Sequence, residues 1–207
     1  MPDLTPRRVS ESALTTTRLM MPEDANPTGH VFGGVILKAI DEIAGMVAVR
    51  HARRPAVTAS IDRVDFWAPV KVGDMLILKA HVNYVGRTSM EVGVRVEAEN
   101  PLTGERRHTA SAYLTFVAID ENGRPTPIPK VIPETEEQRR RYIEAQKRRI
   151  QRLAAAGRIE DLLEARIEEP PTLGDTTPGE ASAGAGRDSA QAPPPSDSAL
   201  SDSTRAR

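Results

Sequence analysis

One long helical segment, followed by four strands, limits the fold of this chain more than any other feature of its sequence. The segment runs from Gly34 to His51, after a Gly-Gly pair and before Pro55. Its apolar residues recur at helical spacing: Ile36, Ile40, Ile43 and Val47. Alternating apolar residues then predict four strands, at residues 56–67, 75–85, 90–99 and 108–119.

The short turns between these strands favour antiparallel pairing. With one more strand before the helix, the chain is expected to form an α+β fold, an antiparallel sheet of about five strands with one helix covering one face. The alternation slips by one residue near Asp62 and Arg63, which indicates a bulge. Segment 90–99 alternates strictly. Its inward face is predicted to hold Met90, Val92, Val94, Val96 and Ala98, and its outward face Glu91, Arg95, Glu97 and Glu99.

Composition divides the chain into three parts: a globular domain at residues 12–132, a charged helical extension at 133–169 and a disordered tail at 170–207. In the extension, Thr135 and Gln138 form a capping-box pattern and Gly157 is a natural C-cap. The apolar stripe of this helix is thin, so we expect it to be largely exposed or to contact a partner. Its seven Arg and Lys residues also fit a basic surface near an anionic ligand, such as the mouth of a ligand site. The tail is rich in Pro, Gly, Ser and Ala and has too little apolar surface to offset the entropy of ordering.

Charge balance and cysteine content exclude several classes of protein. The 207 residues include 28 Lys and Arg against 29 Asp and Glu, a net charge of −1, whereas nucleic-acid-binding domains are usually strongly basic. We therefore expect no nucleic-acid partner. The absence of cysteine removes disulfides and thiol nucleophiles. No segment is apolar enough for a signal peptide or a membrane helix, so we expect a cytoplasmic protein without a membrane partner.

The chain has no G-x-S-x-G, P-loop or G-x-G-x-x-G motif, and its four histidines lack metal-ligand spacing, so no metal site is expected. The remaining candidate is Asp41, at the edge of the apolar face of the helix, where Ala44 and Gly45 leave room for a ligand. A carboxylate in such surroundings can act as a general base. Periodicity fits equally with Asp41 as a boundary residue that pairs with Lys38 or with an arginine of a strand.

Two further features precede this carboxylate. Gly33 and Gly34 open the helix, where free N–H groups and the positive end of the dipole could bind a carbonyl oxygen, although an ordinary loop-to-helix turn would also use them. Asn26 lies in a turn, where asparagine is commonly structural, and its amide could equally hold a water or a carbonyl.

Five segments together resemble the hotdog-fold acyl-CoA thioesterases, in particular the bacterial short-chain enzymes and the cytosolic brain-type acyl-CoA hydrolases. They are N-P-T-G-H-V-F-G-G-V-I-L-K-A-I-D-E-I-A at residues 26–44, V-T-A-S-I-D-R-V-D-F at 57–66, A-P-V-K-V-G-D at 68–74, G-R-T-S-M at 86–90 and F-V-A-I-D at 116–120. The resemblance covers roughly residues 12–130 and leaves out the charged helix and the tail.

The resemblance implies a long central helix wrapped by an antiparallel sheet, and an enzyme that hydrolyses acyl-CoA without a cofactor beyond the coenzyme A of its substrate. Asp41 matches the catalytic carboxylate of the family, and Asn26 the residue that the partner subunit contributes. Gly33 and Gly34 match the glycines whose amides bind the thioester carbonyl. The residues implied to bind coenzyme A are Thr58, Gly86, Arg87, Thr88 and Ser89, although Arg87 also fits a plain surface charge.

Family members act as dimers of hotdogs, often assembled into hexamers as trimers of dimers. The brain-type enzymes carry two hotdogs in one chain, whereas this chain has one, so both halves of the site must come from separate chains.

Two alternatives remain: a regulator that binds acyl-CoA without catalysis, and an enoyl-CoA hydratase, for which His30 is poorly placed relative to Asp41. The sequence leaves open the acyl length and whether Asp41 acts as base or nucleophile.

Overall fold

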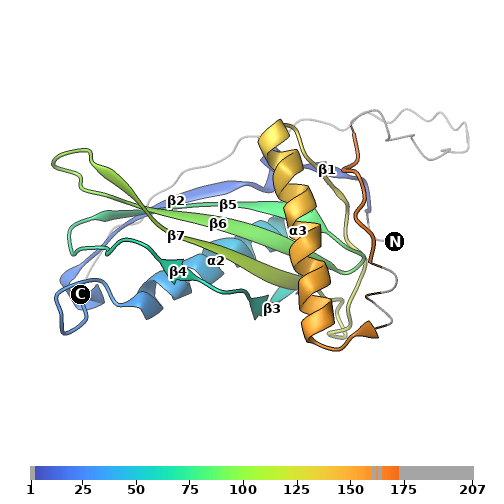
Figure 1. Ribbon diagram of the computed structural model, residues 1–207, viewed down its shortest axis with the longest axis horizontal. Helices are drawn as coiled ribbons and strands as arrows, with labels where there is room; N and C mark the ends of the chain where they lie inside the picture. The colour runs from blue at the N-terminus through green and yellow to red at the C-terminus, as the bar shows by residue number, and fades with distance from the viewer. Residues whose placement is uncertain (1–2, 160–161, 163–164, 173–207) are drawn as a thin grey trace, which may run out of the picture. The chain divides into compact units, whose positions relative to one another are not determined.

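The predicted long helix is α2 (Gly33–Ala52), which lies against one face of an antiparallel sheet (Figure 1). It ends at Arg53, whose φ of 53° lies in the left-handed region, and the N–H of Arg53 donates to the carbonyl of Val49. Such a residue stops a helix, and Pro55 prevents its continuation.

The computed structural model describes residues 3–159, 162 and 165–172 of the chain. The predicted disordered tail lies outside the described residues from residue 173 onward.

Six strands form the main sheet, in the order β2-β5-β6-β7-β3 with β4 paired to β7. They are β2 (Leu14–Leu19), β3 (Ala56–Ile61), β4 (Asp65–Phe66), β5 (Met75–Val85), β6 (Ser89–Glu99) and β7 (Arg106–Ala118). Every pairing in this sheet is antiparallel, as the short turns predicted. The smaller elements are β1 (Arg7–Arg8) and β8 (Val131–Ile132), which form a parallel pair, the helix α1 (Val9–Ser12) and the 3-10 turn η1 (Pro22–Asp24).

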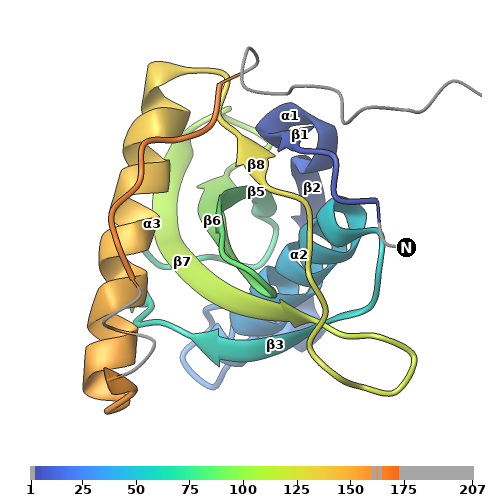
Figure 2. The ribbon, with the colours of Figure 1, turned by 90° about the vertical axis from the view of Figure 1, so that its right-hand side faces the viewer.

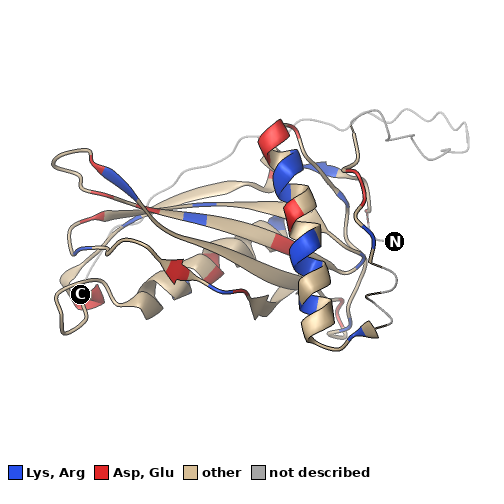
Figure 3. Cartoon of the chain, viewed as in Figure 1, with Lys and Arg blue, Asp and Glu red and all other residues tan. Residues whose placement is uncertain are grey.

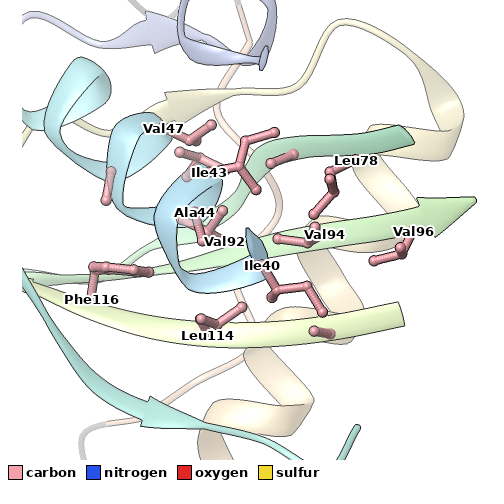
Figure 4. Close-up of a cluster of buried hydrophobic side chains, with 14 of the residues drawn as sticks. Ile40, Ile43, Ala44, Val47, Leu78, Val92, Val94, Val96, Leu114 and Phe116 are labelled. Carbon is pink, nitrogen blue, oxygen red and sulfur yellow. The ribbon is translucent and has the colours of Figure 1, made fainter. Parts of the chain in front are cut away.

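The core lies between α2 and the sheet (Figure 4). The residues predicted to face inward from α2 and from β6 are all buried there. Figure 4 shows Ile40, Ile43 and Val47 of α2 directed at Val92 and Val94 of β6 and at the neighbouring strands. No helix in the described part of the chain is long and apolar enough to cross a membrane.

The sequence predicts one strand over residues 56–67, and this prediction is wrong in detail. The structure has two strands, β3 and β4, with a register shift between Thr58 and Ser60. At the end of β3, the carboxylate of Asp62 binds Arg152 from the C-terminal helix at 2.6 Å, while its backbone N–H still donates to Tyr113. The bulge predicted near Asp62 and Arg63 is wrong in position. The register shift lies earlier, between Thr58 and Ser60, and near Asp62 the strand is interrupted instead.

The charged helix predicted at residues 134–156 is α3 (Glu136–Ala155), capped by Thr135 and Gln138 as expected. It crosses the face of the sheet opposite α2 (Figures 1 and 2). The expectation of a largely exposed helix is wrong, because Tyr142, Ala145 and Leu153 are buried.

Ion pairs supply the rest of this contact. Glu91, predicted to face outward into solvent, is 1% exposed because Arg148 and Arg152 of α3 cover it. The ring of Tyr113 lies 3.7 Å under the guanidinium carbon of Arg148. The helix therefore docks through charged side chains, which a hydropathy pattern does not register.

Candidate active site

Asp41 lies two turns into α2, is half-buried, and is held by one hydroxyl group. Its Oδ1 accepts a hydrogen bond of 2.8 Å from Oγ1 of Thr58 on β3. The predicted alternative, an ion pair with Lys38, is wrong, because Lys38 pairs with Glu42 at 3.8 Å. Asp41 has no ion-pair partner among the described residues. An oriented carboxylate without a neutralising cation is available to a water molecule or a substrate.

Asn26 occupies a turn whose geometry fixes its side-chain amide. Its Oδ1 accepts hydrogen bonds from the N–H of Thr28 at 2.9 Å, the hydroxyl of Thr28 at 2.6 Å and the N–H of His30 at 3.2 Å. The structural role expected for an asparagine in a turn is thus confirmed. The amide nitrogen Nδ2 has no partner among the described residues, so it remains an oriented donor.

Gly33 and Gly34 begin α2, and their N–H groups find no acceptor in the part of the chain that the structure describes. Two aromatic rings that the sequence analysis did not single out flank this helix start. A Cβ at Gly33 would lie 3.8 Å from the ring of Phe66, and one at Gly34 would lie 2.5 Å from the ring of Phe32. The absence of side chains therefore keeps the two amides open beside apolar rings.

These groups fall into two sets within one chain. Asp41 is seven residues beyond Gly34, which places it about 10 Å farther along the helix axis at 1.5 Å per residue. One reacting carbonyl cannot contact both the first amides of α2 and Asp41 of the same chain.

Four exposed apolar side chains lie on α2 and on the neighbouring strand β3, and we call this set the α2–β3 surface. It consists of Met46, Val49, Val57 and Ile61, each 44–49% exposed. Its residues lie next to Thr58 on β3 and beyond Asp41 on α2. This is the side on which a second copy could complete the site.

The segment predicted to bind coenzyme A forms the turn between β5 and β6. The N–H of Gly86 donates to the carbonyl of Ser89 at 2.8 Å, and Arg87 at the tip is exposed. A cleft of about 780 Å³ opens between this turn, the end of β3 and α3. One wall of the cleft belongs to α3, whose basic composition also allowed the prediction that this helix lies near an anionic ligand. No group of three or more His, Asp or Glu side chains in the described residues could hold a metal ion.

Comparisons with known proteins identify the family of this chain. The thioesterase superfamily model matches residues 28–105. An uncharacterized acyl-CoA thioester hydrolase of Bacillus subtilis is 47% identical over 132 residues, which cover 64% of this chain and 77% of the relative. The chain belongs to the acyl-CoA thioesterases of the hotdog fold. It is thus an enzyme, a thioester hydrolase, as the five sequence segments implied.

Two solved hotdog thioesterases show the same architecture. A hexameric acyl-CoA thioesterase is 49% identical, with a TM-score of 0.71 over 73% of this chain and 97% of its own. The acyl-CoA hydrolase of Staphylococcus aureus, solved with butyryl coenzyme A, coenzyme A and coenzyme A disulfide, is 38% identical, with a TM-score of 0.70 over 77% of this chain and 98% of its own. Variants of that enzyme with alanine in place of an aspartate, a threonine or an asparagine have also been solved.

Proposed function

We propose that this thioesterase hydrolyses acyl-CoA to a free acid and coenzyme A, with Asp41 as the catalytic carboxylate. The observation that carries the proposal is the 2.8 Å hydrogen bond from Thr58 to Asp41. It holds one carboxylate oxygen and leaves the other free. That oxygen either takes a proton from the water that attacks the thioester carbonyl, or itself attacks that carbonyl to form an anhydride, which water then cleaves to the free acid. In both routes the C–S bond breaks, and coenzyme A leaves as a thiolate that takes up a proton. Water is the only co-reactant, and no cofactor enters the proposal.

The amides of Gly33 and Gly34 stabilise the oxyanion in this proposal. Negative charge develops on the carbonyl oxygen during attack, and preorganised N–H donors at a helix start lower the energy of that state. Asn26 supplies a further donor through Nδ2, which binds the thioester carbonyl or the attacking water. Both roles follow from donors that have no partner in the described residues of one chain.

The working unit in this proposal is a dimer, in which Asp41 of one chain meets Asn26 of the other. The separation of about 10 Å between Gly34 and Asp41 along α2 supports a site made by two chains, since one chain alone does not bring its helix-start amides to its own carboxylate. The α2–β3 surface supports it as well, because burying this surface would stabilise the pair and cover the edge strand β3. We propose a hexamer, a trimer of such dimers, as the complete particle, as in the hexameric relative.

The test is release of free thiol from acyl-CoA by wild type and by Asp41→Asn, which keeps the shape of the side chain. General acid–base catalysis contributes about 100-fold to 10,000-fold, so we expect kcat to fall at least about 100-fold. Glu42→Gln is the matched control, because Glu42 is the next residue on the exposed side of the same helix. Full activity of Asp41→Asn would exclude the catalytic role. An inactive wild type that still binds acyl-CoA would instead favour the non-catalytic regulator.

A further inference from the structure

The cleft between α3 and the sheet has the size of a ligand site and begins beside the catalytic hydrogen bond. Its volume of about 780 Å³ falls within the range of about 300–1,000 Å³ that small-molecule sites occupy. Ala59 and Ser60, the two residues after Thr58 on β3, line it. The turn that contains Arg87 lines it from the sheet side, and α3 closes the other side. The superfamily match ends at residue 105 and so does not include α3.

The arginines of α3 divide into two kinds. Arg148 and Arg152, one turn apart, are used for docking, since both bind Glu91 and Arg152 also binds Asp62. Arg149, the residue after Arg148, also lines the cleft but has no carboxylate partner among the described residues. The same holds for Arg87. The two carboxylates of the cleft are thus already neutralised, while two of its guanidinium groups are not. Figure 3 shows how basic residues recur along α3.

Contacts place Arg149 at the turn that carries Arg87. Its Nε lies 3.9 Å from the point where a Cβ of Gly86 would be, so the guanidinium rests against the first residue of the turn. Burial raises the pKa of Tyr84 in the wall of the cleft, and the positive charge of Arg149 opposes that rise. The same cleft is lined by Thr115, whose buried Oγ1 has no partner within the described residues.

Two unpaired guanidinium groups and an unpaired hydroxyl in one cleft are the groups that bind a phosphate. Arginine presents a planar fork of N–H donors that matches phosphate oxygens, and such charge-assisted hydrogen bonds are stronger than neutral ones. We propose that Arg149 of α3, together with Arg87, binds a phosphate group at the nucleotide end of acyl-CoA. The inference rests on the proposed function, because the substrate reaches from this cleft to Asp41. The C-terminal helix then belongs to the substrate site.

The experiment compares three thioesters with the same acyl group in wild type and Arg149→Gln. Acyl-CoA has a diphosphate and a 3′-phosphate, acyl-3′-dephospho-CoA lacks the 3′-phosphate, and acyl-pantetheine lacks both. Loss of a charge-assisted contact should raise KM for acyl-CoA about tenfold or more, with kcat changed less than about twofold. KM for acyl-pantetheine should not change. The response of acyl-3′-dephospho-CoA shows which phosphate Arg149 binds.

Two controls separate binding from folding. Arg140→Gln removes a cation from the exposed side of the same helix, where Arg140 pairs with Glu144, and should leave every KM unchanged. Arg149→Lys keeps the charge but not the fork, and should recover part of the affinity. Adenosine 3′,5′-bisphosphate should inhibit wild type competitively with acyl-CoA and inhibit Arg149→Gln about tenfold more weakly.

The outcomes distinguish this inference from the proposed function. If wild type hydrolyses acyl-CoA and Arg149→Gln has an unchanged KM, or raises KM equally for acyl-pantetheine, the phosphate site is wrong and the function stands. Non-competitive inhibition by the bisphosphate would also contradict it, because the nucleotide would then bind apart from the substrate. A wild type that hydrolyses none of the three thioesters contradicts the proposed function itself.

Discussion

At the scale of single residues, the orientation of Asp41, the proposed catalytic carboxylate, depends on one hydroxyl group. Thr58 is exposed in the single chain and orients Asp41 without contributing to the core. Its side chain can therefore be changed with little effect on folding. Substituting Thr58 therefore tests how the orientation of Asp41 affects catalysis while Asp41 itself stays in place.

We expect Thr58→Val, which keeps the shape and removes the donor, to lower kcat about tenfold because one hydrogen bond to a charged group is lost. The melting temperature should stay within about 2 °C of wild type, since surface substitutions change stability by less than about 0.5 kcal/mol. Thr58→Ser should keep most of the activity, because it retains the hydroxyl. Steady-state kinetics and thermal melts measure both effects. A Thr58→Val enzyme with wild-type kcat would show that Asp41 needs no such support.

At the scale of elements, α3 is attached to the sheet by a buried carboxylate. Glu91 receives Arg148 at 2.7 Å and Arg152 at 3.2 Å, and Asn83 donates to it at 3.1 Å. Breaking such a pair from one side leaves the partner charges without compensation. The stability of this contact therefore depends on a residue that lies 57 positions before Arg148 in the chain.

We expect Glu91→Gln to lower the free energy of unfolding by about 3 kcal/mol, because the largely buried Arg148 loses its counter-charge and Arg152 keeps only Asp62. Glu144→Gln is the matched control, since its pair with Arg140 is solvent-exposed and should be worth less than about 1 kcal/mol. Urea unfolding at one protein concentration gives both values. Equal losses for the two variants would show that the buried ion pairs do not hold the helix.

The sequence predicted the elements that depend on apolar alternation. Residues 75–85 were predicted as a strand and are β5, because alternation and flanking turns mark both ends. The burial of Glu91 was not predictable from alternation. Alternation placed it correctly on the face away from α2, but only the helix that follows much later in the chain decides whether that face is buried.

The candidate site was predictable in part for the same reason. Asp41, Asn26 and the two glycines were singled out from the sequence, while the geometry that supports them comes from distant contacts. The bond from Thr58 to Asp41 joins residues 17 apart on different elements, and the ring of Phe66 on β4 lies beside Gly33 at the helix start. Such contacts depend on tertiary structure, which no local pattern encodes.

At the scale of the whole molecule, the α2–β3 surface predicts the assembly. We expect wild type to sediment as dimers or as a trimer of dimers of the 22.5-kDa chain. Met46→Glu places a charge in the middle of the surface and should give monomers that also lose most thiol release, because both halves of the site separate. Leu102→Glu, at an exposed turn 94% open to solvent, should keep the dimer and the activity. An active monomer, measured by light scattering beside the assay, would contradict the shared site.

The proposed sharing of each site between Asp41 of one chain and Asn26 of the other also bears on the effect of a defective allele in a mixed population of chains. In a dimer of one intact chain and one chain without Asp41, the intact chain still offers its carboxylate to the undamaged asparagine of its partner. One of the two sites works. Activity in a mixed population then falls in proportion to the fraction of defective chains, and a defective allele is not dominant over the intact one.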